Sequence, residues 1–367
     1  MALADIYLPG FAGPPPSHLL PLTALLGFVA FLPALAVWSR YCAAVASAGG
    51  LYRFTLLAAG PRWAAAQAGI WALAYLLYLP YTVAYLVYLE LPAVLHLPPA
   101  VSAAVELLLP ALAVLVAARA ERALLLGLAA FAGLQMLALV LWLLLSWRPG
   151  ALPGDPGAWL PAGNWHAWLA LLAGSVQLSS LLVCLSLVVF LGGDAAGGTA
   201  IMPRILRLGA VLAGAAMVVG AVGLALAPGL SGAYAPGPVL AGWPAAFRIL
   251  ALASVLGVVL TEFVALLRLG RALPIRPPGG AFRWVAGIFL LGAAVSLLGP
   301  ARFYQLTLPP SLLGLWLSLL IVFAAYPWFA RRRPQGLRAS DVVLALLACG
   351  WAGFGLYGVV HSMLHGL

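Results

Sequence analysis

The sequence contains no lysine, and only 7% of its 367 residues are charged. All 18 basic residues are arginine, so no lysine can serve as a buried proton carrier or a fixed cation. In contrast, 65% of the residues are hydrophobic and the mean hydropathy is +1.11. These values exclude an ordinary soluble domain and are typical of a polytopic membrane protein. The net charge of +10 is then assigned to loop arginines rather than to a nucleic-acid surface, so no nucleic-acid partner is expected.

Cysteine is scarce as well. Cys42, Cys184 and Cys349 are far apart and lie in or beside apolar runs, which argues against disulfides or a cysteine metal cluster. The five histidines all fall near the ends of apolar runs, where they are poorly placed for haem. No nucleophile–base pair or catalytic motif is visible. We therefore expect no enzyme activity, no cofactor and no metal site.

Long apolar runs dominate what remains. A spanning helix needs about 20 mostly apolar residues, and such runs are unbroken here rather than alternating, which favours a bundle of helices over a barrel. We expect an all-α fold whose ten full spans cover residues 19–39, 62–90, 99–118, 122–146, 166–192, 205–227, 245–267, 283–299, 311–330 and 341–363.

The arginines predict the orientation of these spans. Fifteen of the 18 arginines fall in alternate gaps between the runs, and only Arg148, Arg248 and Arg302 fall in the others. Because cytoplasmic loops are enriched in arginine, the first set is expected to face the cytoplasm. The protein is thus predicted to be a multi-pass protein of the cell inner (cytoplasmic) membrane, with both termini on the extracytoplasmic side.

Three stretches carry a family resemblance. The first predicted cytoplasmic loop reads SAGGLYRFTLLAAGPRW and precedes a long aromatic helix; 166–192 is followed by Asp194 and Pro203; and 245–267 is followed by Arg268, Arg271 and Pro274. In this order the sequence resembles the amino acid–polyamine–organocation permeases. The resemblance implies two inverted repeats of five helices, here residues 1–146 and 166–330, with an additional helix at 341–363.

The resemblance also implies where a substrate would bind. The family's first helix is broken before Leu-Pro-Gly, and ADIYLPGFAG resembles that break with its outer half, whereas the inner half has no counterpart in the sequence. The second break falls on residues 182–186, although neither glycine nor acid there predicts unwinding. Unwound backbone and helix dipoles would hold the substrate. The residues implied at the two breaks are Ala4, Asp5, Ile6, Tyr7, Cys184, Leu185 and Ser186.

Glu262 is the acid placed deepest within a predicted span, and acids in a membrane are costly. It is interpreted as a proton site or a partner of a substrate amine, or alternatively as the partner of Arg268. Glu106, nearer the outer surface, is expected to be interfacial. Tyrosines at spacings of three and four form a stripe along 62–90, which indicates packing or, for Tyr75 and Tyr78, contact with the substrate pathway.

Two functions remain open from the sequence. The first is a secondary transporter of an amino acid or amine that works by alternating access, coupled to Na⁺ or H⁺. Ser254 and Thr261 share a helix face and could bind Na⁺, or could be ordinary small-residue packing. The second is a membrane subunit of the same fold that does not transport and instead serves as a scaffold for a partner protein. In either case the chain lies in lipid.

Overall fold

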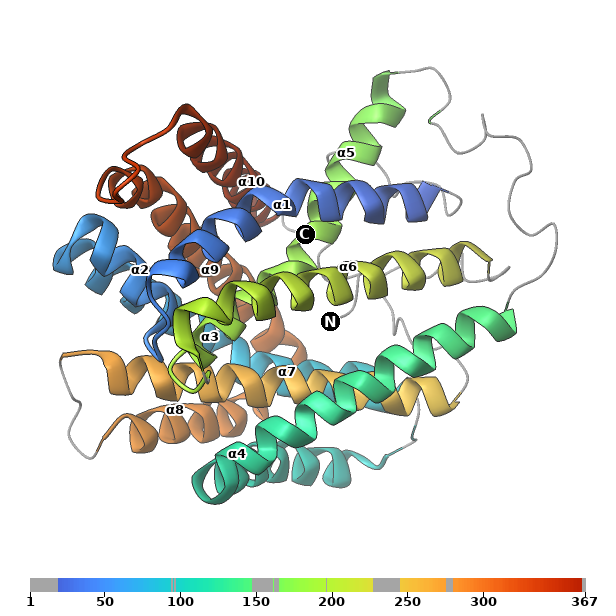
Figure 1. Cartoon of the computed structure of the whole chain (residues 1–367). Helices are drawn as coiled ribbons and strands as arrows, with labels where there is room; N and C mark the ends of the chain where they lie inside the picture. The colour runs from blue at the N-terminus through green and yellow to red at the C-terminus, as the bar shows by residue number, and fades with distance from the viewer. Residues whose placement is uncertain are drawn as a thin grey trace.

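The computed structural model describes residues 19–93, 95, 97–146, 161, 165–195, 197–226, 245–274 and 280–364, and every described element is helical (Figure 1). The elements are α1 (Leu20–Ala44), α2 (Gly50–Ala59), α3 (Pro61–Tyr85), the π-helix η3 (Leu86–Glu90), the 3₁₀-helix η4 (Leu91–Ala93), α4 (Pro99–Ser146), α5 (Trp165–Ser179), the 3₁₀-helices η6 (Ser180–Leu191) and η7 (Gly198–Ala200), α6 (Met202–Leu226), α7 (Ala245–Ala272), α8 (Gly280–Ser296), α9 (Pro300–Arg331) and α10 (Ala339–Leu364).

Seven helical segments among the described residues are long and apolar enough to cross a membrane. Many of their large apolar side chains point outward; Leu108 on α4 is 65% exposed and Leu346 on α10 is 66% exposed. Outward leucines on long apolar helices suit lipid rather than water. The chain is therefore an all-α, multi-pass membrane protein.

The ten predicted runs are helical over nearly all of their described length, but they do not correspond to ten separate helices. Residues 99–118 and 122–146, predicted as two spans, belong to the one continuous helix α4. At 1.5 Å per residue, 48 residues in a straight helix would measure about 72 Å, over twice the thickness of the bilayer core. Figure 1 shows that α4 is bent instead, with two arms that run in different directions.

Two further differences concern segments expected to be loops. The short helix α2 lies within the first predicted cytoplasmic loop and packs on α3, α9 and η6. Helix α9 begins at Pro300, eleven residues before the predicted start at residue 311, and continues through Pro309 and Pro310. Apolar content alone could not indicate either feature, because both segments are short or interrupted by proline.

The centre of the bundle is built from aromatic side chains. Helix α3 packs along α9, and α9 packs along α10. Trp38, Tyr41, Trp71, Phe323 and Tyr326 are completely or almost completely buried there. Their rings pack face to face or edge to face, as for Tyr41 and Phe54, whose ring centroids are 4.8 Å apart. Buried aromatic area of this kind fixes how the helices pack against one another.

Glycine turns meet at one end of the bundle. A Cβ atom built on Gly192, after η6, would lie 2.9 Å from the backbone nitrogen of Ser47, and one on Gly193 would lie 3.0 Å from that of Ala48. Gly50 has a φ of +47° and faces the ring of Phe190. Only glycine permits such a close approach of two backbones. Two of the stretches that carry the family resemblance are therefore in direct contact.

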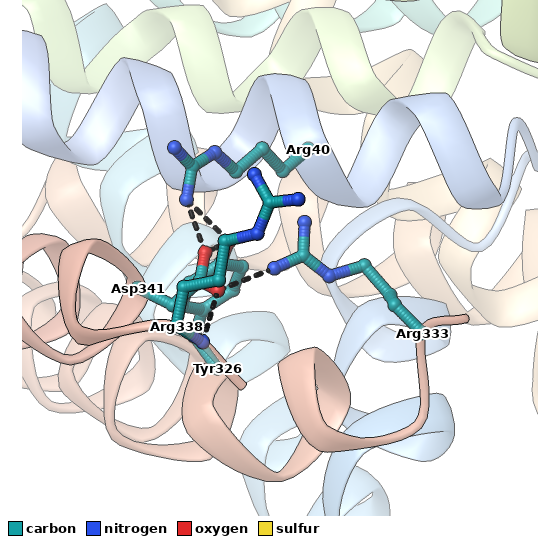
Figure 2. A network of polar contacts seen from close by, with 5 residues as sticks. All are labelled: Arg40, Tyr326, Arg333, Arg338 and Asp341. Carbon is teal, nitrogen blue, oxygen red and sulfur yellow. Dashed lines mark hydrogen bonds and ion pairs between the residues drawn. The ribbon is translucent and has the colours of Figure 1, made fainter. Parts of the chain in front are cut away.

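Asp341 forms the centre of a polar network at the same arginine-rich end (Figure 2). Its carboxylate is paired with Arg40 of α1 and, at 2.7 Å, with Arg333, which follows α9. It also accepts hydrogen bonds from the Tyr326 hydroxyl at 2.9 Å and the Arg338 amide at 3.0 Å. Because Asp341 is only 1% exposed, these contacts tie α1, α9 and α10 together.

Candidate functional site

Glu262 lies where α3, η6 and α7 pack against one another. It begins a stretch of eight consecutive buried residues, 262–269, so α7 is enclosed on all sides there. Glu262 is ten residues before Ala272, the end of α7, which corresponds to about 15 Å along the helix. The sequence prediction that Glu262 lies deep within a helix is confirmed.

Neither carboxylate oxygen of Glu262 has a hydrogen-bond partner among the described residues. The alternative partner considered from the sequence, Arg268, instead pairs with Asp194 and donates a hydrogen bond of 3.2 Å to the Phe190 carbonyl. A carboxylate without a counter-charge is strongly disfavoured in an apolar interior. Glu262 is therefore a buried acid whose partner is not supplied by any described side chain.

Tyr75 of α3 and Ser186 of η6 lie beside Glu262. The Tyr75 hydroxyl lies near enough to Ser186 for a side-chain hydrogen bond and interacts electrostatically with Cys184 and Glu262, and Tyr78 likewise interacts with Cys184 and Glu262. The Tyr75 and Ser186 hydroxyls are both buried and lie near each other but, like the Glu262 carboxylate, make no hydrogen bond of good geometry among the described residues. Native proteins rarely leave such groups unsatisfied. Three helices thus place three unsatisfied polar groups in one cluster.

We call this cluster of Tyr75, Tyr78, Cys184, Ser186 and Glu262 the Glu262 cluster. All five residues were predicted from the sequence to line a substrate site, and the structure brings them together. Their role in binding a substrate stays a prediction.

The helix that carries Ser186 changes type at this position. The α-helix of α5 ends at Ser179, and η6 continues as a 3₁₀-helix for 12 residues, from Ser180 to Leu191. Such runs seldom exceed three or four residues, and within a longer helix they often mark a hinge or a strained segment. Residues 182–186 are therefore helical, not unwound as the resemblance implies, but they are no longer α-helical.

Aromatic rings border the Glu262 cluster, and the sequence analysis missed two of them. Trp71 packs against Tyr75 with ring centroids 4.3 Å apart, and against Phe190 at 4.6 Å. The tyrosine stripe continues from Tyr75 through Tyr78 and Tyr81, the last of which contacts Tyr304 of α9. Trp71 lies four residues before Tyr75, so extending the stripe by one turn would have identified it.

Several predicted site residues do not join the cluster. Leu185 faces α6, where a Cβ atom on Gly209 would lie 3.5 Å from its Cδ2. Thr261 donates a hydrogen bond of 2.8 Å to the Gly257 carbonyl of its own helix, the usual arrangement for a membrane threonine. The side chain of Ser254 lies outside the described residues, as do Ala4, Asp5, Ile6 and Tyr7. The proposed Na⁺ site and the first-helix half of the site therefore stay predictions.

Glu106 is a second buried acid, in a different place. It is completely buried between helices, and its position at the membrane interface stays a prediction. One carboxylate oxygen accepts a hydrogen bond from Ser296 of α8, and Tyr88 of the π-helix η3 lies within reach of it. Glu106 thus fastens the first arm of α4 to α8, whereas Glu262 has no such contact.

The Glu262 cluster combines one acid with hydroxyl groups that can both donate and accept hydrogen bonds, and no described cationic side chain joins it. A carboxylate, two hydroxyl oxygens and the faces of several aromatic rings all attract a cation. Among the described residues, no group of three His, Cys, Asp or Glu side chains is arranged to hold a metal ion. An organic cation or a proton suits these groups better than a multivalent metal.

Comparisons with known proteins add no relative. No family model matches the chain, and no curated protein matches its sequence. The resemblance to amino acid–polyamine–organocation permeases therefore rests on the motifs quoted above.

Proposed function

We propose that the protein is a secondary transporter for a small amine or amino acid, with the Glu262 cluster as its substrate site. The observation that carries the proposal is the set of three buried, unsatisfied polar groups, Tyr75, Ser186 and Glu262, contributed by three different helices. Each such group costs free energy unless a ligand or ordered water satisfies it. A site near the middle of the membrane, built where a helix departs from α-geometry, is what alternating access uses.

Closure at the arginine-rich end also supports transport. Phe190 lies between the Glu262 cluster and this end, where it packs on Trp71 and against Gly50. Beyond it, the glycine turns and the pair of Arg268 with Asp194 join η6 to α7 and to the loop after α1. In the proposed cycle these contacts separate to open the site towards the cytoplasm, while η6 acts as the hinge.

The first test is uptake into proteoliposomes of five labelled compounds: leucine, arginine, glutamate, putrescine and choline. We expect saturable uptake of at least one, reduced at least tenfold in Glu262→Ala because the substrate loses its charged contact. Glu106→Gln is the matched control, since it alters a buried acid outside the cluster, and it should retain uptake. Uptake that is equal in wild type and Glu262→Ala would refute the assignment of the site.

The second candidate is a scaffold subunit without transport activity, favoured by the continuous helix across residues 182–186. A helix without unwound backbone offers no free amides to a substrate, which is the reason the family's breaks exist. The same experiment separates the two functions. Absence of uptake for all five compounds, together with stable co-purification of one stoichiometric membrane protein, would favour the scaffold.

A further inference from the structure

We infer that Glu262 exchanges a proton for an organic ammonium ion, so that the protein is a proton–amine antiporter. This inference rests on the proposed transport function and specifies its substrate class and its coupling ion. It follows from the charges of the Glu262 cluster, which can balance a substrate ammonium group but not a substrate carboxylate.

The cluster lacks a partner for a substrate carboxylate. No described arginine side chain contacts Glu262, and Arg268, two turns further along α7, is occupied by Asp194 and the Phe190 carbonyl. The sequence contains no lysine. The amides of η6 are used within its own 3₁₀-helix, so they are not available as an anion site. A carboxylate of an amino acid would therefore meet neutral hydroxyl and indole donors but no described cationic side chain, and it would be repelled by the acid Glu262.

The same groups suit an ammonium ion. Glu262 offers a counter-charge, the Tyr75 and Ser186 hydroxyls offer acceptor oxygens, and the rings of Trp71, Tyr75 and Tyr78 offer π-faces. Ammonium groups are recognised by this combination of a carboxylate with aromatic rings. The substrate class is thus a primary or quaternary amine that carries no carboxylate.

The empty site needs a different cation. Burial without a counter-charge disfavours the charged form of the Glu262 side chain, so in the empty site it holds a proton as a neutral carboxylic acid. When an ammonium ion enters, the carboxylic O–H bond breaks, the proton leaves to water on the side to which the site is open, and the carboxylate pairs with the ammonium. One positive charge is exchanged for one, and no electrons are transferred. A site that holds either ion but not both couples their gradients.

The other titratable groups around Glu262 do not compete for this proton. Among the described residues, the titratable groups that interact with it are Tyr75 and Tyr78 on α3 and Cys184 on η6. Phenols and thiols ordinarily lose their protons only above about pH 8. Of the cluster's described residues, Glu262 is therefore the one assigned to proton exchange between about pH 5 and pH 8.

The experiment measures binding and proton release together. Purified full-length protein in weakly buffered detergent solution receives choline, putrescine, leucine or glutamate; equilibrium dialysis of the labelled compound reports binding, and a pH dye reports protons. We expect choline or putrescine to bind with release of about one proton per site filled. Where the free protein is protonated, the apparent Kd should rise about tenfold for each unit that the pH falls.

Variants assign the proton. Glu262→Gln should abolish proton release and make any residual binding independent of pH, whereas Glu106→Gln should behave as wild type. Glu262→Asp, which keeps the acid on a shorter side chain, should release protons with weaker binding, and it serves if the glutamine variant does not fold. Monodisperse elution from size exclusion is required of every variant.

The outcomes distinguish the two proposals. Binding of leucine or glutamate in preference to the amines, or binding of an amine without proton release, would overturn the antiport inference while the transport function stands. If none of these compounds binds and none of the five compounds in the uptake assay is transported, the proposed function fails and the inference fails with it.

Discussion

Two buried acids, Glu262 and Asp341, illustrate how differently a buried carboxyl group can be used. Asp341 of α10 is surrounded by donors from α1, from α9 and from the connection between α9 and α10, and two of these donors are arginines that balance its charge (Figure 2). Glu262 is equally buried but has no partner among the described residues. Burial with partners is structural, whereas burial without partners indicates a site completed by a ligand.

Replacing Asp341 should destabilise the fold. In Asp341→Asn the carboxylate charge is lost, and Arg40 and Arg333 are left as neighbouring cations without a counter-charge. We expect the free energy of unfolding to fall by about 2–3 kcal/mol. Thermal unfolding in detergent, followed by tryptophan fluorescence, would show a lower Tm.

Asp194→Asn is the matched control for this prediction. It also removes an acid paired with arginine, but the Asp194 side chain is 63% exposed, and Arg268, at 7% exposed, keeps its hydrogen bond to the Phe190 carbonyl. Its cost should stay below about 1 kcal/mol. Equal losses in the two variants would show that the Asp341 network does not fasten the helices.

Individual site residues could be predicted where chemistry singled them out. Glu262 was identified because an acid within an apolar run is costly, and Ser186 because the resemblance located a break by counting from Asp194. Leu185 was identified by the same count, but one position along a 3₁₀-helix turns a side chain by about 120°. The Asp341 network was missed because Arg40 lies 301 residues before Asp341, so only the packing of α1 on α9 and α10 brings the two together.

Close helix packing in the bundle depends on glycine at particular points. On α1, a Cβ atom at Gly27 would lie 2.5 Å from the Ser175 carbonyl oxygen of α5. On α6, Gly214 faces the ring of Phe28 in the same way. Small residues at helix contacts are how membrane helices approach closely without a hydrophobic driving force.

Gly27→Ala should therefore force α1 and α5 apart. The obstructing atom is backbone and cannot move aside, so we expect a loss of about 1–3 kcal/mol in unfolding free energy. Gly69→Ala is the control, because a Cβ atom there meets nothing within 4 Å; it should be neutral or stabilise α3 by up to about 1 kcal/mol. Thermal unfolding in detergent compares the two, and a loss in both or in neither would contradict the packing described.

The positions of the helices were largely predictable from the sequence, but whether a segment is α-helical or 3₁₀-helical was not. Each apolar run is long enough that only a helix satisfies its backbone in lipid. The choice between α and 3₁₀ in η6 is different, because both satisfy the backbone and the packing of neighbouring helices selects one. The continuity of α4 across residues 119–122 was missed for a related reason: charged residues there indicated a loop, yet they are compatible with a helix that bends.

At the level of the whole molecule, the arginine-rich ends of the helices gather on one side. The loop after α1 contacts the turn after η6, Gly49 approaches Ala272 at the end of α7, and Arg40 and Arg333 share Asp341. At the opposite ends, Tyr85 of α3 meets Tyr304 of α9, with ring centroids 5.8 Å apart. The alternation of arginines along the sequence thus corresponds to two ends of one bundle.

Whether the arginine-rich end faces the cytoplasm can be tested with single cysteines in a variant lacking Cys42, Cys184 and Cys349. Gln335→Cys places a thiol in the exposed turn between α9 and α10, and Leu298→Cys places one between α8 and α9, where the native side chain is 89% exposed. Because cytoplasmic loops are enriched in arginine, a membrane-impermeant maleimide applied to intact spheroplasts should label Leu298→Cys and leave Gln335→Cys unmodified. Permeabilised spheroplasts should label both positions, which controls for reactivity. The reverse pattern would invert the orientation, and with it the side from which the contacts around Gly192 and Arg268 would open to admit a substrate; labelling of both positions in intact spheroplasts would contradict two ends separated by a membrane.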